Sequence, residues 1–295
     1  MRADVAFDSH GTLCRAWHYA PDGATAEGPC VVMAHGFGAT RDASLEPYAL
    51  RFAAAGMHVL LFDYRHFGAS DGQPRQLLSV HRQLQDYAAA VAFARSLPGV
   101  DRERIAVWGT SFSGGHALVT AATVPGVAAA VAQCPMMDGL AAVLGIVGYA
   151  GLGQVLRLTV HGLWDLALAP FGRAHYIPTV GRPGTLAVMS SPDSEAGYLA
   201  LCPPGFRCEV AARVALFVGL YRPVRYASRA RCPVLVQICE HDSVAPPAAA
   251  EKVVAALGSG EVQRYPIGHF EPYFGAPFER SVSDQLAFLR RHLRA

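Results

Sequence analysis

Residues 104–115 have the sequence RIAVWGTSFSGG, and this stretch decides the fold. The apolar run 104–108 has the length of a buried strand, and a helical pattern follows over 116–123. A strand, a tight turn that carries a serine, and a helix together make the layout of a nucleophile elbow. We therefore predict that Ser111 stands at the N-terminus of a helix, whose dipole favours a developing negative charge.

One position of the elbow departs from the usual pattern G-x-S-x-G. Ser113 stands where the second glycine is expected, and Gly114 and Gly115 come directly after it. Serine is small enough to let the helix pack close to the strand. The alternative interpretation is an ordinary strand-to-helix turn rich in small residues.

Length and composition exclude several classes of protein. The 295 residues fit one large α/β domain or two small ones. A net charge of +2 without a Lys/Arg cluster predicts no nucleic-acid partner. The apolar stretch 140–170 contains Gln154, Arg157 and His161, and its cleanest window, 139–155, is too short to span a bilayer. We therefore expect no stable membrane insertion, and the absence of a signal-peptide core near the N-terminus predicts a cytoplasmic protein.

The cysteines do not form a recognisable metal or disulfide pattern. Seven of them are scattered along the chain without a C-x-x-C pair, which predicts buried thiols and no metal site. Cys202 and Cys208 flank Pro-Pro-Gly and could meet, but reduced thiols are favoured in a cytoplasm. The glycines of 148–153 do not follow a strand, so they fail the test for a dinucleotide site, and we expect no cofactor.

Strands and helices alternate over most of the chain. This pattern predicts a mostly parallel, doubly wound α/β sheet built from residues 1–135 and 231–295. Residues 136–230 interrupt the alternation after the sixth core strand. They predict helices at Leu140–Gly151, Val155–Ala169 and Glu209–Tyr221, with a Pro/Gly-rich loop at Phe171–Pro204. We interpret this insertion as a lid over the carboxyl ends of the strands, and the alternative is a plain loop insertion.

A serine nucleophile needs a base, and the base needs a group that orients it. His269 stands in a loop after the last predicted strand, from which its imidazole can reach Ser111. Asp242 follows the buried strand at 234–238 and can accept the imidazole N–H. Asp138, after the strand at 127–132, is the rival acid, and Asp242 is favoured over it. A helix cap or a turn is the structural alternative for Asp242.

The turn after the strand at 30–34 supplies the remaining chemistry. It has the sequence His35-Gly36-Phe37-Gly38, and its small residues let a backbone N–H point at the carbonyl oxygen under attack. We predict that the amides of Phe37 and Phe112 form the oxyanion hole. His35 itself is interpreted as structural.

Taken together, these segments resemble the α/β-hydrolase fold. The resemblance rests on His35–Gly38, Asp63–Ser70, the elbow at Ser111, Asp242–Pro246 and Gly268-His269, in the order Ser, Asp, His. It implies Ser111 as nucleophile, His269 as base and Asp242 as orienting acid, with oxyanion donors at Phe37 and Phe112. Three positions depart from the family pattern, namely Ser113, His66 and Cys239. The Asp63 segment is expected to be structural, held through Arg65.

The resemblance implies a serine hydrolase that cleaves carboxylic esters, thioesters included, of hydrophobic small molecules through an acyl-serine. An acyltransferase is the alternative, since residues 109–116 also look similar to polyketide-processing α/β-hydrolase-like proteins. A prolyl-type peptidase would need an acid in the lid, for which only Glu195 and Glu209 are available. A non-catalytic binding module is the fourth hypothesis, and it is disfavoured because both Ser111 and His269 are present. Assembly into a homo-oligomer stays open.

Overall fold

The protein is described by a computed structural model that covers residues 2–21, 23 and 27–294. Its main sheet has the strand order β1-β2-β4-β3-β5-β6-β9-β10. The strands are β1 (Arg2–Ser9), β2 (Thr12–Tyr19), β3 (Gly28–Ala34), β4 (His58–Phe62), β5 (Val100–Thr110), β6 (Val127–Gln133), β9 (Val234–Cys239) and β10 (Gly260–Tyr265). Only β2 pairs in antiparallel fashion, with β1 and with β4, and the other pairs are parallel. The predicted mostly parallel sheet is confirmed.

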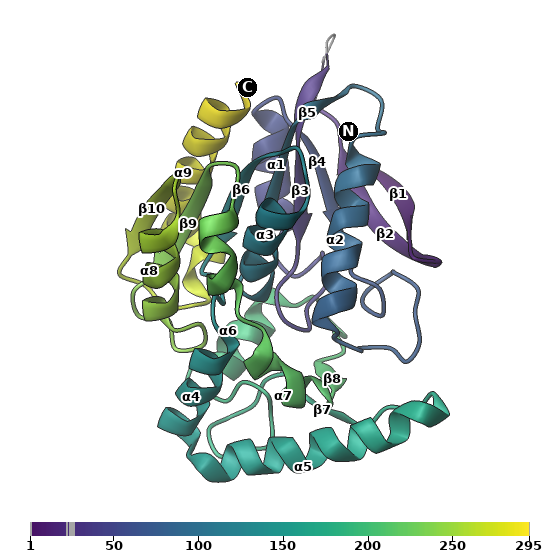
Figure 1. Ribbon diagram of the computed structural model, residues 1–295, viewed down its shortest axis with the longest axis vertical. Helices are drawn as coiled ribbons and strands as arrows, with labels where there is room; N and C mark the ends of the chain where they lie inside the picture. Colours follow the sequence, from purple (N-terminus) through teal and green to yellow (C-terminus); the bar gives the residue numbers. More distant parts are fainter. Residues whose placement is uncertain (1, 22, 24–26, 295) are drawn as a thin grey trace.

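Helices cover both faces of this sheet (Figure 1). Alternate side chains of β3 enter two separate cores, because successive residues of a strand point to opposite faces. Val31 and Met33 pack with α1 (Glu46–Ala54) and α9 (Gly275–Leu293). Val32 and Ala34 pack with α2 (Val80–Ala94), α3 (Phe112–Thr123) and α8 (Pro247–Ala256). The sheet is therefore a buried platform, and the loops at its carboxyl edge are held on both sides.

The segment between β6 and β9 gathers at one end of the sheet (Figure 1). It begins with the two helices expected there, α4 (Gly139–Ala150) and α5 (Leu152–Leu168). The remaining elements are β7 (Tyr176–Pro178), α6 (Ser194–Leu201), β8 (Glu209–Ala211), α7 (Val214–Phe217) and the 3₁₀ turns η1 (Ala169–Phe171), η2 (Val218–Leu220) and η3 (Pro223–Arg229).

Two predictions for this segment are wrong. The helix expected at Glu209–Tyr221 is instead the strand β8 followed by the single turn of α7 and by η2. Long-range bonds override the local helical pattern, because β8 pairs with β7 and the Ala211 N–H donates to the Gln76 carbonyl at 2.9 Å. The stretch Phe171–Pro204 is not a plain loop, since it contains β7 and the eight-residue helix α6.

Two further observations concern membrane spans, metal sites and disulfides. Within the described ranges, no helix is long and apolar enough to cross a membrane, and no group of three or more His, Cys, Asp or Glu side chains is placed to bind a metal. All seven cysteines lie in the described ranges and are free thiols, so Cys202 and Cys208 do not form a disulfide.

Candidate active site

Ser111 occupies a strained turn between β5 and α3. Its backbone has φ 54° and ψ −118°, a conformation that a non-glycine residue adopts only when its surroundings impose it. The close approach of the helix to the strand imposes it here. A Cβ at Gly109 would lie 1.8 Å from the Ser113 carbonyl oxygen, and one at Gly114 would lie 2.6 Å from Pro135. Glycine at these positions therefore permits the turn that lifts the Ser111 side chain out of the sheet.

Ser113, the residue that departs from the motif, points away from the site. Its side chain is fully buried, with its Oγ hydrogen-bonded to the His35 carbonyl and 2.7 Å from the Tyr64 hydroxyl. A serine at this position, where the motif has glycine, therefore ties α3 to the turn after β3. This geometry leaves Ser111 as the serine of the elbow that lines the cavities of the site.

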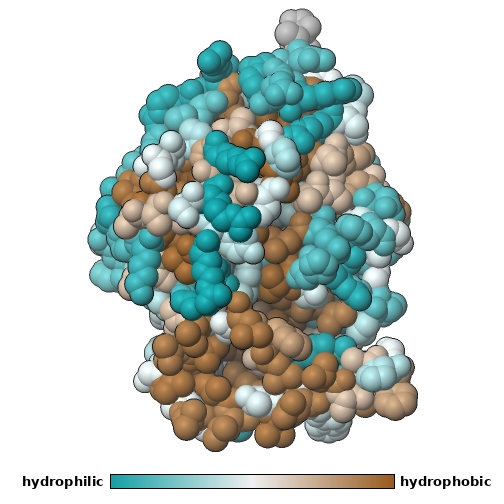
Figure 2. Space-filling model, in the orientation of Figure 1, coloured by the Kyte–Doolittle hydropathy of each residue, from teal (hydrophilic) through white to brown (hydrophobic). Residues whose placement is uncertain are grey.

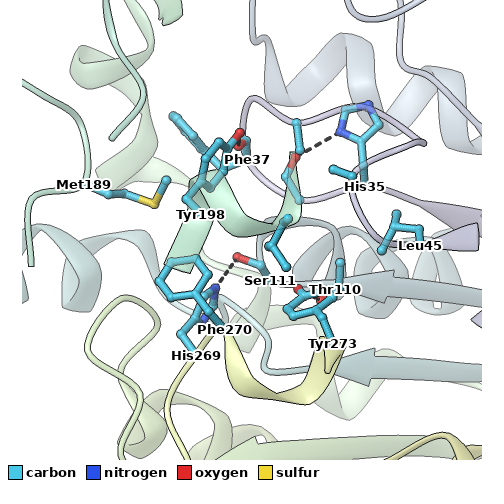
Figure 3. Close-up of a pocket in the computed structure, with 14 residues that line it drawn as sticks. His35, Phe37, Leu45, Thr110, Ser111, Met189, Tyr198, His269, Phe270 and Tyr273 are labelled. Atoms are coloured by element: carbon cyan, nitrogen blue, oxygen red, sulfur yellow. Dashed lines mark hydrogen bonds between the residues drawn. The ribbon is translucent and has the colours of Figure 1, made fainter. Parts of the chain in front are cut away.

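Three side chains from separate loops form one hydrogen-bonded chain. His269 Nε2 lies 3.0 Å from Ser111 Oγ, and His269 Nδ1 lies 2.6 Å from Asp242 Oδ2 (Figure 3 shows the first of these contacts). The other Asp242 oxygen accepts the Val244 and Ala245 amides at 2.8 and 2.6 Å. These two amides fix the carboxylate, which in turn fixes the imidazole.

The environment of His269 sets its basicity. Burial alone lowers the pKa of His269, but the Asp242 carboxylate outweighs this effect and raises the pKa above 6.5, to about 9. The imidazole that hydrogen-bonds Ser111 Oγ is therefore a stronger base than a free histidine.

The two predicted oxyanion donors belong to the elbow and to the turn that packs against it. Phe112 opens α3, so its N–H has no intrahelical acceptor. Phe37 comes from the turn after β3, and its carbonyl accepts the Tyr198 hydroxyl at 2.9 Å. The turn can approach the elbow because Gly36 has no side chain: a Cβ there would lie 3.3 Å from Ser111 Cβ. The role of these amides stays a prediction.

Comparison with known proteins decides the family. The family model for serine aminopeptidase, S33, matches residues 26–270. The chain belongs to this family. The quorum-quenching protein AidA of Acinetobacter baumannii (strain MDR-ZJ06) is 43% identical over 293 residues, or 98% of this chain and 94% of that protein. The polyketide transferase grgF of Penicillium sp is 37% identical over 138 residues, or 46% of each chain.

A solved structure extends the comparison to the whole fold. The α/β hydrolase GrgF from Penicillium sp. sh18 superposes with a TM-score of 0.83 at 24% identity, over 100% of both chains. This likeness confirms the α/β-hydrolase fold. The family match and the curated relatives make this chain a hydrolase or an acyltransferase of the α/β-hydrolase family.

Asp138, the alternative candidate for the acid that orients the base, does not contact His269 in this S33 family member. Its side chain caps α4 by accepting the Leu140 amide at 3.0 Å, and it forms an ion pair with Arg222 at 2.7 Å. Asp138 thus begins a helix and ties that helix to the chain after η2. The structure brings Asp242, and not Asp138, to His269.

The histidine-glycine turn and the Asp63 segment have structural roles, because their side chains bond to the surrounding backbone. His35 is fully buried, its Nδ1 lies 3.0 Å from the Gly36 carbonyl oxygen, and burial lowers its pKa to about 4. Asp63 accepts the Arg41 and Ala69 amides at 2.7 and 3.0 Å. The expectation that this loop is held through Arg65 is confirmed by the contacts of that side chain.

Arg65 fixes the loop to the helix α2. Its Nε donates to Asp86 of α2 at 2.6 Å, so it anchors the loop to that helix. His66 is also buried, and its Nε2 lies 2.9 Å from an Arg82 nitrogen. Neither residue lines the cavities at Ser111.

Sequence reasoning missed the groups that enclose the site from the inserted segment. Met189 and Tyr198 line a cavity with Ser111 and His269 (Figure 3), and Leu201 lines the same cavity. They belong to the stretch predicted as a loop, where no periodic pattern marks them. Tyr273, which comes after His269 and not from the inserted segment, was also missed; its hydroxyl lies 2.5 Å from Thr110 Oγ1.

Proposed function

We propose that this enzyme is a serine hydrolase that cleaves carboxylic esters, thioesters included, of small apolar molecules. The observation that carries the proposal is the hydrogen-bonded chain from Ser111 through His269 to Asp242. A hydroxyl, a buried imidazole and a fixed carboxylate in this order are the groups that acyl transfer to serine requires.

The reaction proceeds through an acyl-serine. Ser111 Oγ attacks the carbonyl carbon while its proton moves to His269 Nε2, and the amides of Phe37 and Phe112 hold the oxygen that becomes negative. The carbonyl reforms as the leaving group departs with the proton from His269. Water then repeats the sequence, using the same base, and releases the acid.

We further propose that residues 136–230 serve as the lid over this site and that the chain works in the cytoplasm. The lid is supported by Met189 and Ile146, which reach the cavities at Ser111 from that segment. The cytoplasmic location is supported by the seven free thiols, because oxidising compartments favour disulfides.

Acyl transfer is the second candidate, and similarity to the polyketide transferase grgF favours it. In that case an alcohol or amine replaces water in the second half of the reaction. The description of the family model also names a peptidase. The two lid acids that such an activity would use, Glu195 and Glu209, are each engaged in an ion pair with an exposed arginine, Arg182 and Arg207, which disfavours it.

Mass spectrometry after treatment with a fluorophosphonate tests the proposal. We expect one adduct, on Ser111, together with turnover of p-nitrophenyl esters, and the loss of both in Ser111→Ala. The product mixture formed in the presence of a competing alcohol separates hydrolysis from transfer. No adduct and no turnover in the folded wild-type protein, or an adduct on Ser113, would refute the proposal.

A further inference from the structure

Two apolar cavities meet at Ser111. The first, the α4 cavity, lies between the elbow and α4, and its own lining residues include Phe112, Met136, Ala142, Val143 and Ile146. The second, the His269 cavity, is lined by His269 and Tyr273, which Figure 3 labels, and also by Ala43 and Leu201. Phe37, Ser111 and Met189 line both cavities.

The catalytic groups give the two cavities different roles. His269 must hand its proton to the departing oxygen or sulfur, so the leaving group has to lie beside the imidazole. The imidazole lines only the second cavity. A carbonyl carbon bonded to Ser111 Oγ, with its oxygen at the Phe37 and Phe112 amides, has one remaining substituent, the acyl chain. The α4 cavity is the space left for that substituent.

We propose that the acyl chain binds in the α4 cavity and that the leaving group binds in the His269 cavity, an assignment that rests on the proposed function. The α4 cavity has a volume of about 60 Å³ and the His269 cavity about 30 Å³. Apart from Ser111 and Tyr149, the α4 cavity is lined by apolar residues. The substrate class is therefore an ester or thioester with an apolar acyl chain and the smaller group on the leaving side.

Two variant pairs separate the cavities. Ile146→Trp fills the α4 cavity and Ile146→Ala widens it, while Leu201→Trp and Leu201→Ala do the same on the other side. Each variant is assayed on an acyl series, p-nitrophenyl acetate to octanoate, and on an alcohol series, methyl to hexyl butanoate. Leu50→Trp, at an exposed position of α1 that lines neither cavity, is the control.

We expect each pair of variants to change the profile of one substrate series and to leave the other unchanged. Ile146→Trp lowers the octanoate-to-acetate ratio of kcat/KM by roughly tenfold or more, and Ile146→Ala raises it, while the alcohol series keeps the wild-type profile. The Leu201 variants change only the alcohol series. The opposite signs expected for tryptophan and alanine exclude simple misfolding as the cause.

Two different failures are distinguishable. If the Ile146 variants reshape the alcohol series, or the Leu201 variants the acyl series, the assignment is overturned while the proposed function stands. If wild-type protein neither turns over any ester nor accepts a fluorophosphonate at Ser111, the proposed function fails and the assignment fails with it.

A second inference comes from α5, whose polarity is inverted. Its buried positions carry Gln154, Leu158, Gly162 and Asp165, and the polar members are satisfied by the Ala187 carbonyl and by Arg213. Its exposed positions are apolar except for Arg157. We define the outer patch as α5 residues Leu152, Leu156, Val160, Leu163, Trp164 and Leu166 with Leu144 of α4, each 41–64% exposed.

The outer patch is large enough to be an interface. Figure 2 shows apolar surface gathered over the end of the molecule where Figure 1 draws α4 and α5. With about 100 Å² exposed on each large side chain, its seven residues come close to the roughly 800 Å² that each partner buries in a stable complex. A surface of this size on a soluble chain marks an interaction site.

We infer that a second copy of this chain covers the outer patch, with the two α5 helices packed antiparallel about a twofold axis. Six of the seven residues of the outer patch follow one side of α5, so this side can be paired with the same side of a second copy. Within α5, which the structure describes in full, Arg157 is the one exposed charged side chain, and it donates to Gln154 Oε1 and to the Gly184 carbonyl. An anionic membrane surface would instead be met by basic residues along the polar margin of the helix.

Light scattering coupled to size-exclusion chromatography tests this inference. We expect twice the mass of one chain for the wild type, one chain mass for the double variant Leu156→Glu/Val160→Glu, and a dimer for the control Leu50→Glu, whose side chain is also about half exposed. A monomeric wild type at micromolar concentration overturns the inference. Sedimentation of that monomer with vesicles of phosphatidylcholine and phosphatidylglycerol would assign the patch to a membrane instead.

Discussion

Replacing Asp242 by asparagine tests whether this carboxylate sets the tautomer of His269. Asp242 accepts three hydrogen bonds, from the Val244 and Ala245 amides on Oδ1 and from His269 on Oδ2. The two amides can only donate, so the side-chain oxygen of the introduced asparagine must face them. Its NH₂ group then faces His269 Nδ1, which has to accept. The imidazole proton moves to Nε2, the atom that should accept the proton of Ser111.

This tautomer removes the base without changing the shape of the site. We expect kcat for a p-nitrophenyl ester to fall by about 10⁴-fold, equivalent to about 5.5 kcal/mol of transition-state stabilisation. The melting temperature should change little, because asparagine has the size of aspartate. Asp138→Asn is the matched control: it weakens the α4 cap and the Arg222 ion pair, and should leave kcat within a few-fold of the wild type.

Two outcomes would contradict this reasoning. One is an Asp242→Asn variant that keeps kcat within tenfold of the wild type. The other is a larger loss of kcat in Asp138→Asn than in Asp242→Asn, which would make Asp138 the orienting acid.

Three further predictions concern the same loops. Because the pKa of His269 is raised and only the neutral imidazole is a base, kcat/KM should fall as pH drops through a value above 6.5; an acid limb below pH 6 in a pH–rate profile would contradict this. Gly109→Ala should lower the free energy of unfolding by at least about 3 kcal/mol, because the new Cβ clashes with the Ser113 carbonyl. Gly148→Ala is the control: a Cβ there meets no atom within 4 Å, so this variant should gain up to about 1 kcal/mol. Urea denaturation measures both changes. Ser113→Ala should lose about 1–3 kcal/mol through its broken hydrogen bonds, yet keep the fluorophosphonate adduct on Ser111; loss of that adduct from folded protein would contradict the structural role.

The core sheet and the loops at its edge could be predicted because their signals are local. The central buried strands are short apolar runs, and Ser111 and Asp242 each come within three residues of the end of one. His269 comes four residues after the end of the more polar edge strand β10. Parallel strands bring their carboxyl ends to one edge, so positions after strands are brought together whatever their separation along the chain.

Beyond its first two helices, α4 and α5, the inserted segment could not be predicted in the same way. Its folding depends on distant partners, such as Arg213 with Asp165 and the Gln76 amide with the Glu209 carbonyl. The helical pattern at 209–221 was outweighed by these bonds and by the pairing of β7 with β8. Tyr198 and Leu201 reach the site on a helix of eight residues, too short to leave a clear periodic signal.

The spacing of the catalytic groups has a consequence for biosynthesis. Ser111 and His269 are 158 positions apart, so at ordinary translation speeds the ribosome adds the imidazole roughly 8 to 30 s after the hydroxyl. The elbow belongs to β5 and α3, whereas the acid and the base arrive only behind β9 and β10. A nascent or prematurely terminated polypeptide therefore carries an inert serine, and reactivity begins once the last strands have joined the sheet.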